Sequence, residues 1–311
     1  MGYDLGIDIG GTSIKIGVTD NCLRLIYKDS FPTRTKDGER AIMDDLKAKC
    51  REIKQKFDIS HIGVGCPGDK DEANVSILRA GNLPFINLPI VKELEEIFEK
   101  DVFLDNDGNC ALIAEWLCGS GKGLGDMVMV TIGTGIGGGC IVNRGILRGV
   151  DNDGGELGHF SIDPGGLDCP CGQKGCFERF ASASALIDAT VKAARSNPGS
   201  LLSAYCERQA VDGTTVFAAL RDGCRAAEGV LEEYGARLAT GLNGLCYIFA
   251  PELLVLAGGI TKEGETLLRF VRPKLIFPEK VKISSLGGDA GMLGASHLHI
   301  FADYYLSLRK Q

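Results

Sequence analysis

Four residues of the sequence have the types and spacing of a metal-binding loop. Cys169 and Cys171 are separated by one residue, Cys176 follows, and His159 precedes the first of these cysteines by ten residues. Three thiolates and one imidazole form the donor set of a closed tetrahedral Zn²⁺ site, which holds structure and leaves no position open for a reactant. The glycines between the cysteines let the chain wrap around a single ion. We therefore predict a structural Zn²⁺ held by His159, Cys169, Cys171 and Cys176.

Two glycine-rich turns have the composition of an anion-binding loop. Gly10 and Gly11 are followed by Thr12, and Thr134 stands between Gly133 and Gly135. Backbone N–H groups without neighbouring side chains, together with a hydroxyl, can cradle an anion. Each turn also joins two strand-like segments, which indicates a weak internal β–turn–β repeat whose two tips could face each other across a cleft. The alternative is that both are simple tight hairpin turns.

Two other interpretations of the glycine-rich segments are contradicted by the residues next to the glycines. The run Gly119-Ser120-Gly121-Lys122 resembles a phosphate-binding P-loop, but Trp116 and Gly123 occupy the positions of the required glycine and hydroxyl. Residues 133–138 match the dinucleotide pattern G-x-G-x-x-G, which must open a helix. Residues 140–142 read instead as a short strand, so a nicotinamide-dependent dehydrogenase is disfavoured.

Asp107 is the candidate general base. It follows the predicted strand 102–104 and precedes the predicted helix 109–117, at the carboxyl end of a strand where crevices form in α/β proteins. A carboxylate in that place can orient a hydroxyl and accept its proton. The alternative is that Asp107 only caps the helix, a role for which aspartate is well suited.

The elements that must position these residues alternate between strand and helix, which predicts an α/β fold with mostly central sheets. We place a domain boundary in the glycine-rich stretch 118–126, between a small domain 1–118, completed by a C-terminal helix at about 298–311, and a large domain 119–297 that carries the metal loop. Strands are expected at 3–9, 14–19, 23–28, 61–65, 102–104, 127–132, 140–142 and 253–257. Helices are expected at 39–57, 89–100, 109–117, 181–196, 214–220 and 224–249.

Composition excludes several classes of protein. The 311 residues include 43 glycines and carry a net charge of −7, so general binding to nucleic acid is disfavoured. No apolar run is long enough to span a membrane, and the start of the chain, with Asp4 and Asp8, lacks the basic region of a signal peptide. The twelve cysteines are therefore interpreted as cytosolic thiols, apart from the three metal ligands. A cytoplasmic protein with no membrane partner is expected.

Five segments together resemble the ROK family of sugar kinases and related repressors, within the actin–hexokinase–Hsp70 fold group. They cover nearly the whole chain in family order, and LAGGI at 256–260 is similar to the family's adenosine loop. The resemblance implies a two-lobed actin-like ATPase fold of the ribonuclease H-like class, with a cleft between its domains. The five segments are DIGGTSIK (8–15), NDGN (106–109), TIGTGIGGG (131–139), GELGH (155–159) and CPCGQKGCFE (169–178).

The resemblance also implies roles for individual residues. Asp8 would act through water on Mg²⁺-bound ATP phosphates, and Asp107 would be the base. Phosphoryl transfer needs positioning and charge neutralisation above all. The remaining ATP-binding residues implied are Gly10, Gly11, Thr12, Lys15, Thr134, Gly135, Gly258 and Gly259. The implied sugar ligands are Asn82, Asn106, Asp107, Glu156, His159 and Glu178, with His159 serving both zinc and sugar.

The expected activity is transfer of the ATP γ-phosphoryl to a hexose, with glucose to glucose 6-phosphate as first choice, in carbohydrate metabolism and glycolysis. Gly108, Phe85 and the acidic run 69–75 depart from the family pattern near the sugar pocket. Kinases of N-acetylmannosamine, N-acetylglucosamine or other hexoses therefore stay open, as does polyphosphate as donor. A sugar-sensing regulator is the more distant alternative, disfavoured because this chain opens directly on the phosphate hairpin. A homodimer is implied by resemblance.

Overall fold

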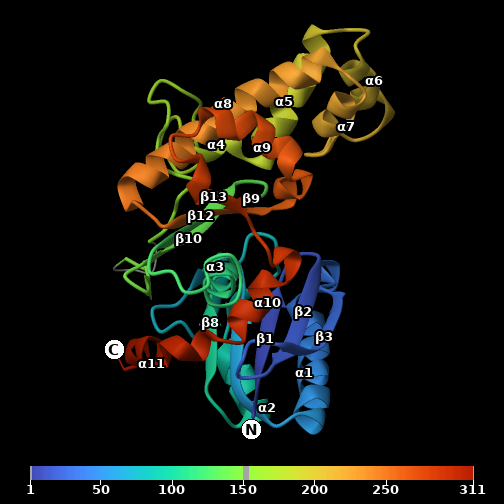
Figure 1. Cartoon of the computed structure of the whole chain (residues 1–311). Helices are drawn as coiled ribbons and strands as arrows, with labels where there is room; N and C mark the ends of the chain where they lie inside the picture. Colours follow the sequence, from blue (N-terminus) through green and yellow to red (C-terminus); the bar gives the residue numbers. More distant parts are fainter. Residues whose placement is uncertain (1, 150–153, 311) are drawn as a thin grey trace. The chain divides into compact units, whose positions relative to one another are not determined.

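Two five-stranded sheets form the centres of two separate units of the chain (Figure 1). The computed structural model describes residues 2–149 and 154–310. Unit 1 contains residues 1–122 and 288–311, and unit 2 contains residues 123–287. The expected domains divided at 118 and 297, so the structure assigns the segment 288–297 to the first unit instead of the second. The α/β fold class is confirmed.

The sheet of unit 1 runs in the order β3-β2-β1-β4-β8. Strands β1, β4 and β8 are parallel, whereas β2 and β3 continue the sheet antiparallel from β1. The apolar side chains of Leu5, Ile7 and Ile9 are fully buried on one face of β1, and Asp4 and Gly6 on its other face are buried as well, as is usual for strands in the middle of a covered sheet. The strands are β1 (Tyr3–Ile9), β2 (Ser13–Thr19), β3 (Leu25–Pro32), β4 (Ile59–Gly65) and β8 (Val102–Asp105).

Helices cover this sheet, and the last part of the chain returns to it. Helix α1 (Glu39–Lys56) buries an apolar stripe that includes Ile42, Leu46 and Ile53. Helix α10 (Ala290–Ala295) packs against β1 and against α3 (Asp107–Leu117) (Figure 1). The expected C-terminal helix is split into a short 3₁₀ turn, Leu298–Phe301, and α11 (Ala302–Leu308), and residue 311 lies outside the described residues.

Helices α3 and α10 touch through their backbones. A Cβ atom at Gly294 would lie 1.6 Å from the carbonyl oxygen of Cys110, so only glycine allows this approach. Unit 1 also contains α2 (Ile90–Phe98) and a small antiparallel sheet of β5 (Asp69–Lys70), β6 (Ile77–Arg79) and β7 (Ile86–Leu88).

Unit 2 has the sheet order β11-β10-β9-β12-β13. Strand β9 pairs antiparallel with β10 and parallel with β12, as β1 pairs with β2 and β4. The predicted β–turn–β repeat is therefore confirmed. Strand β10 begins at Ile136, earlier than expected, so the glycines at 137–139 lie within the strand. The strands are β9 (Met127–Ile132), β10 (Ile136–Val142), β11 (Gly145–Ile146), β12 (Leu253–Gly258) and β13 (Val281–Ile283).

Helix α8 is the longest helix of unit 2 and buries residues along its whole length, among them Leu231, Leu238 and Leu245. Together with its neighbours it packs on the apolar side chains of β9 and β12 to form a single core. The helices are α4 (Glu178–Ala181), α5 (Ala183–Ser196), α6 (Leu201–Arg208), α7 (Thr215–Arg221), α8 (Arg225–Phe249) and α9 (Glu265–Val271).

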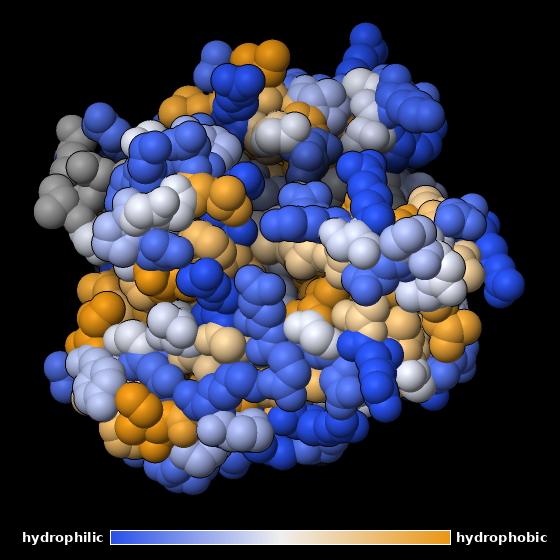
Figure 2. Space-filling view, turned by 90° about the horizontal axis from the view of Figure 1, so that it is seen from above, coloured by the Kyte–Doolittle hydropathy of each residue, from blue (hydrophilic) through white to orange (hydrophobic). Residues whose placement is uncertain are grey.

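The face of the molecule in Figure 2 is mostly polar, with apolar residues in small separate groups. Across the described residues, we find no helix whose length and hydropathy would suit a bilayer crossing.

Candidate functional site

The carboxyl ends of three parallel strands bring the acidic residues of unit 1 together. In the strand register, Asp8 of β1 lies beside Gly65 of β4, and Gly65 lies beside Asp105 of β8. Asp107 is the first residue of α3, two positions after the end of β8. Asp8 and Asp107 are close enough that the charge of Asp107 raises the pKa of Asp8. Asp8 and Asp107, which were predicted separately, thus both lie at the carboxyl ends of the strands of this sheet.

Asp107 is not the cap of its helix. Asn106 holds that position, and its Oδ1 accepts a hydrogen bond of 2.8 Å from the backbone N–H of Gly108. The Oδ1 atom of Asp107 accepts a longer bond, 3.0 Å, from the same N–H. Burial raises the pKa of the Asp107 carboxyl, whereas the Gly108 N–H and the charge of Lys70 lower it. A half-buried carboxylate with its second oxygen free of the cap is suited to accept a proton.

Asp105 fixes the start of α3, and the sequence analysis did not identify it. Its Oδ1 accepts hydrogen bonds from the backbone N–H of Asn106 (2.7 Å) and the side chain of Asn109 (2.8 Å). Its Oδ2 accepts a short hydrogen bond from the hydroxyl of Tyr305 in α11. The fully buried carboxylate therefore ties the residue before Asp107 to the returning C-terminal segment. The only sequence signal is an aspartate at the end of an apolar strand.

Asp8 is a partly buried carboxylate among other charges. The net effect of its surroundings raises its pKa to about 6: burial is the largest cause, the charge of Lys15 opposes it, and the charges of Asp107 and Asp289 add to it. The ammonium of Lys15 lies 3.8 Å from Asp8 Oδ2 and donates a short hydrogen bond to the carbonyl of Gly288. Lys15 thus holds the segment before α10 beside Asp8. Asp289, which the sequence analysis missed, forms an ion pair of 2.6 Å with Lys28.

Hydrogen bonds from Thr33, directly after the end of β3, hold the first glycine turn, residues 10–12. The side chain of Thr33 donates to the carbonyl of Gly10 (2.5 Å), and its backbone N–H donates to the carbonyl of Thr12 (3.1 Å). Gly11 and Thr12 are exposed at the tip. Asn82, also exposed, lies beside Gly11, because a Cβ there would be 3.4 Å from the Asn82 Cβ. The predicted sugar ligand Asn82 therefore adjoins the predicted phosphate turn.

A lysine that the sequence analysis did not identify, Lys70, lies near Asp107. Its ammonium donates hydrogen bonds to the carbonyls of Cys66 (3.0 Å) and Gly68 (2.8 Å). This turn packs on the start of α3, since a Cβ at Gly65 would lie 3.6 Å from the Cα of Asp107. Lys70 is the cation whose charge lowers the pKa of Asp107.

The second glycine turn and the adenosine-like loop lie side by side in unit 2. Gly133 donates a hydrogen bond of 3.0 Å to the carbonyl of Gly135, which closes the turn and leaves Thr134 exposed. Gly258, at the end of β12, is paired with Ile132 at the end of β9. Its φ of +100° and a would-be Cβ only 2.3 Å from the Ile132 oxygen both require glycine. Gly259 follows in open space.

The four predicted metal ligands converge. One donor atom from each of them lies within 4.8 Å of all the others. The Sγ atoms of Cys171 and Cys176 are 3.6 Å apart, and the Sγ of Cys169 is 3.6 Å from His159 Nδ1. A regular tetrahedron with bonds of ~2.3 Å to sulfur and ~2.05 Å to nitrogen has edges of ~3.6–3.8 Å. The donor set and its spacing fit a Zn²⁺ ion.

Glu178 joins this loop to the second glycine turn. Its Oε1 lies 3.4 Å from the Sγ of Cys169 and 3.8 Å from His159 Nδ1. Its Oε2 would lie 2.6 Å from a Cβ at Gly135. Glu156 is exposed, and its backbone carbonyl accepts a hydrogen bond of 3.1 Å from the N–H of His159. Since Nδ1 of His159 faces the cysteines, its Nε2 is available to another partner.

The structure thus forms two groups from the predicted residues. Unit 1 brings together Asp8, Gly10, Gly11, Thr12, Lys15, Asn82, Asn106 and Asp107. Unit 2 brings together Thr134, Gly135, His159, Cys169, Cys171, Cys176 and Glu178, with Gly258 and Gly259 on the neighbouring strand end and Glu156 at the surface.

Each unit contains the same kind of sheet with a glycine hairpin, and the first unit has two aspartates at its strand ends. This is the fold of the actin-like sugar phosphotransferases. The sequence model of the ROK family matches residues 4–301, and the chain belongs to the ROK family.

Relatives of known name cover nearly the whole chain. A glucokinase from Thermotoga maritima is 31% identical over 94% of this chain and 96% of its own length. An N-acetyl-D-glucosamine kinase from Citrobacter koseri is 29% identical over 95% of this chain and 98% of its own. The crystal structure of a ROK family glucokinase from Streptomyces griseus in complex with glucose and AMPPNP is 31% identical. It covers 96% of this chain and 99% of its own, with a TM-score of 0.77.

Proposed function

We propose that the protein is an ATP-dependent hexose kinase that converts glucose to glucose 6-phosphate. One observation carries the proposal: Asp107 presents a half-buried carboxylate at the strand ends beside Asp8, with the cap of its helix made by Asn106 instead. In a ROK protein with glucokinase relatives, a free carboxylate at this point supports a base that acts on a sugar hydroxyl.

In the reaction, Asp107 orients the hydroxyl on C6 of the sugar and takes its proton. The hydroxyl oxygen forms a bond to the γ-phosphorus as the bond from that phosphorus to the bridging oxygen of ADP breaks. Little covalent work falls to the protein, because the transition state is stabilised by position and charge. The proton that leaves the hydroxyl stays on Asp107 until the product departs.

The glycine turn of each unit is a proposed ligand of ATP phosphates. In unit 1 the ligands proposed are Gly10, Gly11, Thr12 and Lys15, and in unit 2 they are Thr134 and Gly135. Gly258 and Gly259 offer backbone without side chains to the adenosine. Asp8 fits a role near Mg²⁺, because a partly buried carboxylate whose pKa is raised by desolvation and by neighbouring carboxylates is stabilised in its ionised form by a divalent cation. Bound Mg²⁺ would neutralise phosphate charge.

The proposed sugar ligands combine carboxylates, amides and an imidazole, which suit hydroxyls that both donate and accept. Besides Asp107 they are Asn82, Asn106, Glu156, His159 and Glu178. A Zn²⁺ on His159, Cys169, Cys171 and Cys176 would fix the tautomer and direction of the His159 ring. Glu178 contacts two of these ligands, Cys169 and His159. We therefore propose that the same Zn²⁺ ion also orients Glu178.

The identity of the hexose is the most specific part of the proposal. The N-acetyl-D-glucosamine kinase among the relatives supports that sugar, and after it N-acetylmannosamine, as the second candidate. One pocket contact changes discrimination by only about 1–3 kcal/mol, so small changes in the pocket wall can exchange one hexose for another. Polyphosphate as donor and a non-catalytic sensor are further alternatives that the experiment below separates.

We also propose a homodimer and a cytoplasmic location. The side chains of Tyr247 and Ile276 are hydrophobic and exposed, by 66% and 53%. Phe277, which follows Ile276 in the chain, packs its ring against that of Tyr247 with 5.8 Å between the ring centroids, so the exposed residues belong to one surface. An apolar surface of this kind supports contact with a second copy. All twelve cysteines are free thiols, which supports a reducing compartment.

The test is ADP release with Mg-ATP across a panel of glucose, mannose, N-acetylglucosamine and N-acetylmannosamine. The proposal predicts the highest kcat/KM with glucose. Highest turnover of an N-acetyl sugar would replace glucose with that sugar. Binding of a sugar with no ADP release from ATP and no sugar phosphate formed from polyphosphate would place the protein among the sensors and overturn the kinase proposal, whereas sugar phosphate formed only with polyphosphate would replace ATP as the donor.

A further inference from the structure

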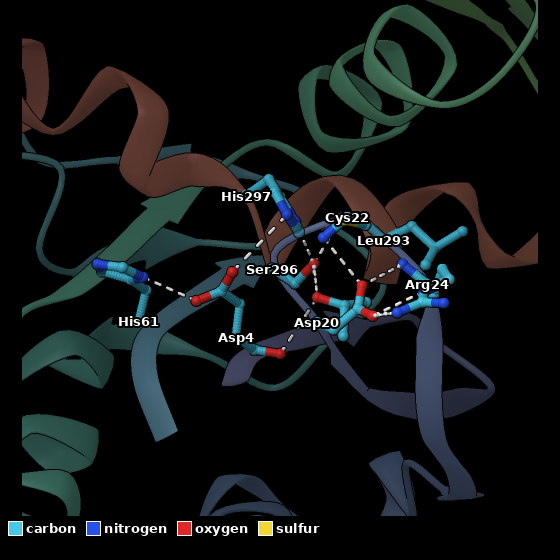
Figure 3. A network of polar contacts seen from close by, with 9 residues as sticks. Asp4, Asp20, Cys22, Arg24, His61, Leu293, Ser296 and His297 are labelled. Atoms are coloured by element: carbon cyan, nitrogen blue, oxygen red, sulfur yellow. Dashed lines mark hydrogen bonds and ion pairs between the residues drawn. The ribbon is translucent and has the colours of Figure 1, made fainter. Parts of the chain in front are cut away.

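A cluster of three histidines around a buried aspartate lies in unit 1, and the proposed kinase chemistry uses none of it. Asp4 of β1 is 3% exposed. His61 of β4 approaches it with Nδ1 at 2.7 Å from Oδ1, and His297 from the C-terminal segment approaches Oδ2 with Nε2 at 3.7 Å (Figure 3). His299 stacks on His61, with ring centroids 3.9 Å apart. One donor atom from each of Asp4, His61 and His299 lies within 4.8 Å of the other two.

The cluster is separate from the predicted phosphate site. Asp4 and Asp8 belong to the same strand, and four residues of extended chain span about 13 Å. Asp8 lies at the carboxyl end of β1, whereas Asp4 lies near the amino end, beside His61 near the start of β4. A ligand at Asp4 would therefore not touch the groups assigned to ATP.

The hydrogen bonds around His297 favour the tautomer in which a nitrogen lone pair is directed at the carboxylate. The hydroxyl of Ser296 donates to the carbonyl of Leu293 at 2.8 Å, and its oxygen is also 2.8 Å from His297 Nδ1 (Figure 3). Ser296 has one proton, so when Leu293 takes it, Nδ1 of a neutral His297 must be the donor to Ser296. Nε2 of that ring then has no proton. A bare nitrogen facing a carboxylate oxygen is favourable when a cation lies nearby.

His299 supplies a second incomplete contact. Its Nδ1 is buried and makes no hydrogen bond of good geometry among the described residues, with the backbone of Ser296 as a polar neighbour of the ring. A buried nitrogen that is poorly satisfied costs about 1–3 kcal/mol. One carboxylate oxygen of Asp4 and one nitrogen each of His61 and His299 thus lie close enough to share an ion, with the ring of His297 beside them. A divalent cation would bind the carboxylate and both imidazoles.

Space next to the cluster gives an ion a way in. A cavity of about 370 Å³ is lined by His61 and His299 together with Ser60, Lys100, Asp101 and Phe103. The side chain of His61 is 46% exposed. Because the two stacked rings are nearly parallel, at 10°, an ion in the plane of both requires one of them to turn. The exposed ring of His61 has the room to do so.

We propose that Asp4, His61 and His299, with His297 beside them, form a binding site for a divalent first-row transition-metal ion, with Zn²⁺ as its principal occupant. Imidazole nitrogens with a single carboxylate favour Zn²⁺ and its neighbours, whereas Mg²⁺ and Ca²⁺ prefer sites made of oxygen atoms. The ion would connect β1 and β4 with the returning C-terminal segment. It would therefore stabilise unit 1 in proportion to its occupancy.

The test is the metal content of the purified full-length chain after equilibrium dialysis at about 1 µM free Zn²⁺, where only sites with lower Kd fill. The variants are wild type, the double variant His61→Gln/His299→Gln, and Asp20→Asn as control, whose carboxylate is bonded to Arg24 in the same unit. The wild type and the control should each bind one Zn²⁺ per chain more than the double variant. That difference does not depend on whether the cysteine loop is also filled.

A second readout uses folding instead of content. Added Zn²⁺ should raise the Tm of the wild type treated with chelator by several degrees more than that of the double variant. Equal Zn²⁺ content and equal Tm shifts in the two proteins would overturn the proposal. If the double variant fails to fold, the single variant His61→Gln replaces it, since that side chain is at the surface.

Discussion

Gly291 of helix α10 lies directly against the carboxylate of Asp8: a Cβ atom at position 291 would come within 2.9 Å of Asp8 Cγ and Oδ2. The residue proposed to act on the ATP phosphates through Mg²⁺ therefore has its place fixed by a segment at the other end of the chain. The same segment is held by Lys15, which donates to the carbonyl of Gly288.

Substitution Gly291→Ala should displace the Asp8 carboxylate. The added methyl carbon would lie 2.9 Å from Asp8 Cγ, which is closer than two non-bonded carbon atoms can approach, so one of the two groups must move. We expect kcat/KM for Mg-ATP to fall by about 10- to 100-fold, as misplaced catalytic groups commonly cause. Steady-state kinetics with saturating sugar measures the effect. The control is Gly229→Ala in α8, where a Cβ meets open space. Unchanged kinetics in Gly291→Ala would show that the Asp8 position is not critical.

Asp8→Asn should make the protein more stable while it removes activity. The folded-state pKa of about 6 lies above the usual 3.8, so the ionised carboxylate costs stability once the pH exceeds both values. That cost is absent below pH ~4, where both states are protonated. At pH 8 we expect a free energy of unfolding higher by about 1–3 kcal/mol, because the pKa of about 6 already includes the attraction to Lys15. Urea unfolding at pH 8 and pH 4 should show a gain at the first pH only. A loss at pH 8 would contradict the electrostatic account of Asp8.

Much of the fold was predictable because its signals are local. The strands β1 and β9 alternate or run apolar over six or seven residues, and each ends at glycines, so their positions follow from pattern alone. The metal loop was predictable for the same reason: three of its four ligands lie within eight residues. Asp107 could be found because a strand and a helix bracket it.

What could not be predicted depends on contacts between distant segments. Helix α10 has six residues, two of them glycines, which gives too few positions for a helical period. Its glycines serve backbone contact with Cys110 and with Asp8, and no local pattern encodes those partners. Lys70 sits in a strand of two residues, so the carbonyls that hold it near Asp107 are invisible in the sequence.

Lys70 should set the pH range in which Asp107 works as a base. Burial raises the pKa of Asp107 and Lys70 lowers it. Since the base must be ionised, activity is lost as pH falls through that pKa. In Lys70→Met the pKa of Asp107 rises, so the acidic limb of kcat/KM moves to higher pH. The loss of kcat/KM relative to the wild type should therefore be largest at the acidic end of the profile and smallest at its alkaline end.

The pH profile of kcat/KM, measured with Lys70→Arg and Lys92→Met beside it, checks this expectation. Lys70→Arg keeps the charge and should restore most of the profile, and the exposed Lys92 should have no effect. A uniform loss at every pH in Lys70→Met would indicate that Lys70 supports structure alone.

Loss of the metal loop should weaken sugar binding more than ATP binding. In Cys171→Ser the orientation of His159 and Glu178 is no longer fixed by the ion, and such changes cost about 10–100-fold. We expect KM for glucose to rise by that factor and KM for ATP to change by less than about threefold. Cys22→Ser, an exposed thiol in unit 1, is the matched control. Equal rises in both KM values would mean that the loop stabilises unit 2 as a whole.

The most direct test of the account is the turnover of Asp107→Asn beside that of the wild type and of Asp101→Asn, an exposed aspartate with 61% of its side chain accessible. The amide keeps the size of the carboxylate but cannot take the proton of the sugar hydroxyl. The account predicts that kcat falls by about 10²–10⁴-fold in Asp107→Asn while the Kd for glucose, measured by calorimetry, stays within a few fold. A kcat within a few fold of the wild type would contradict the assignment of Asp107 as the general base.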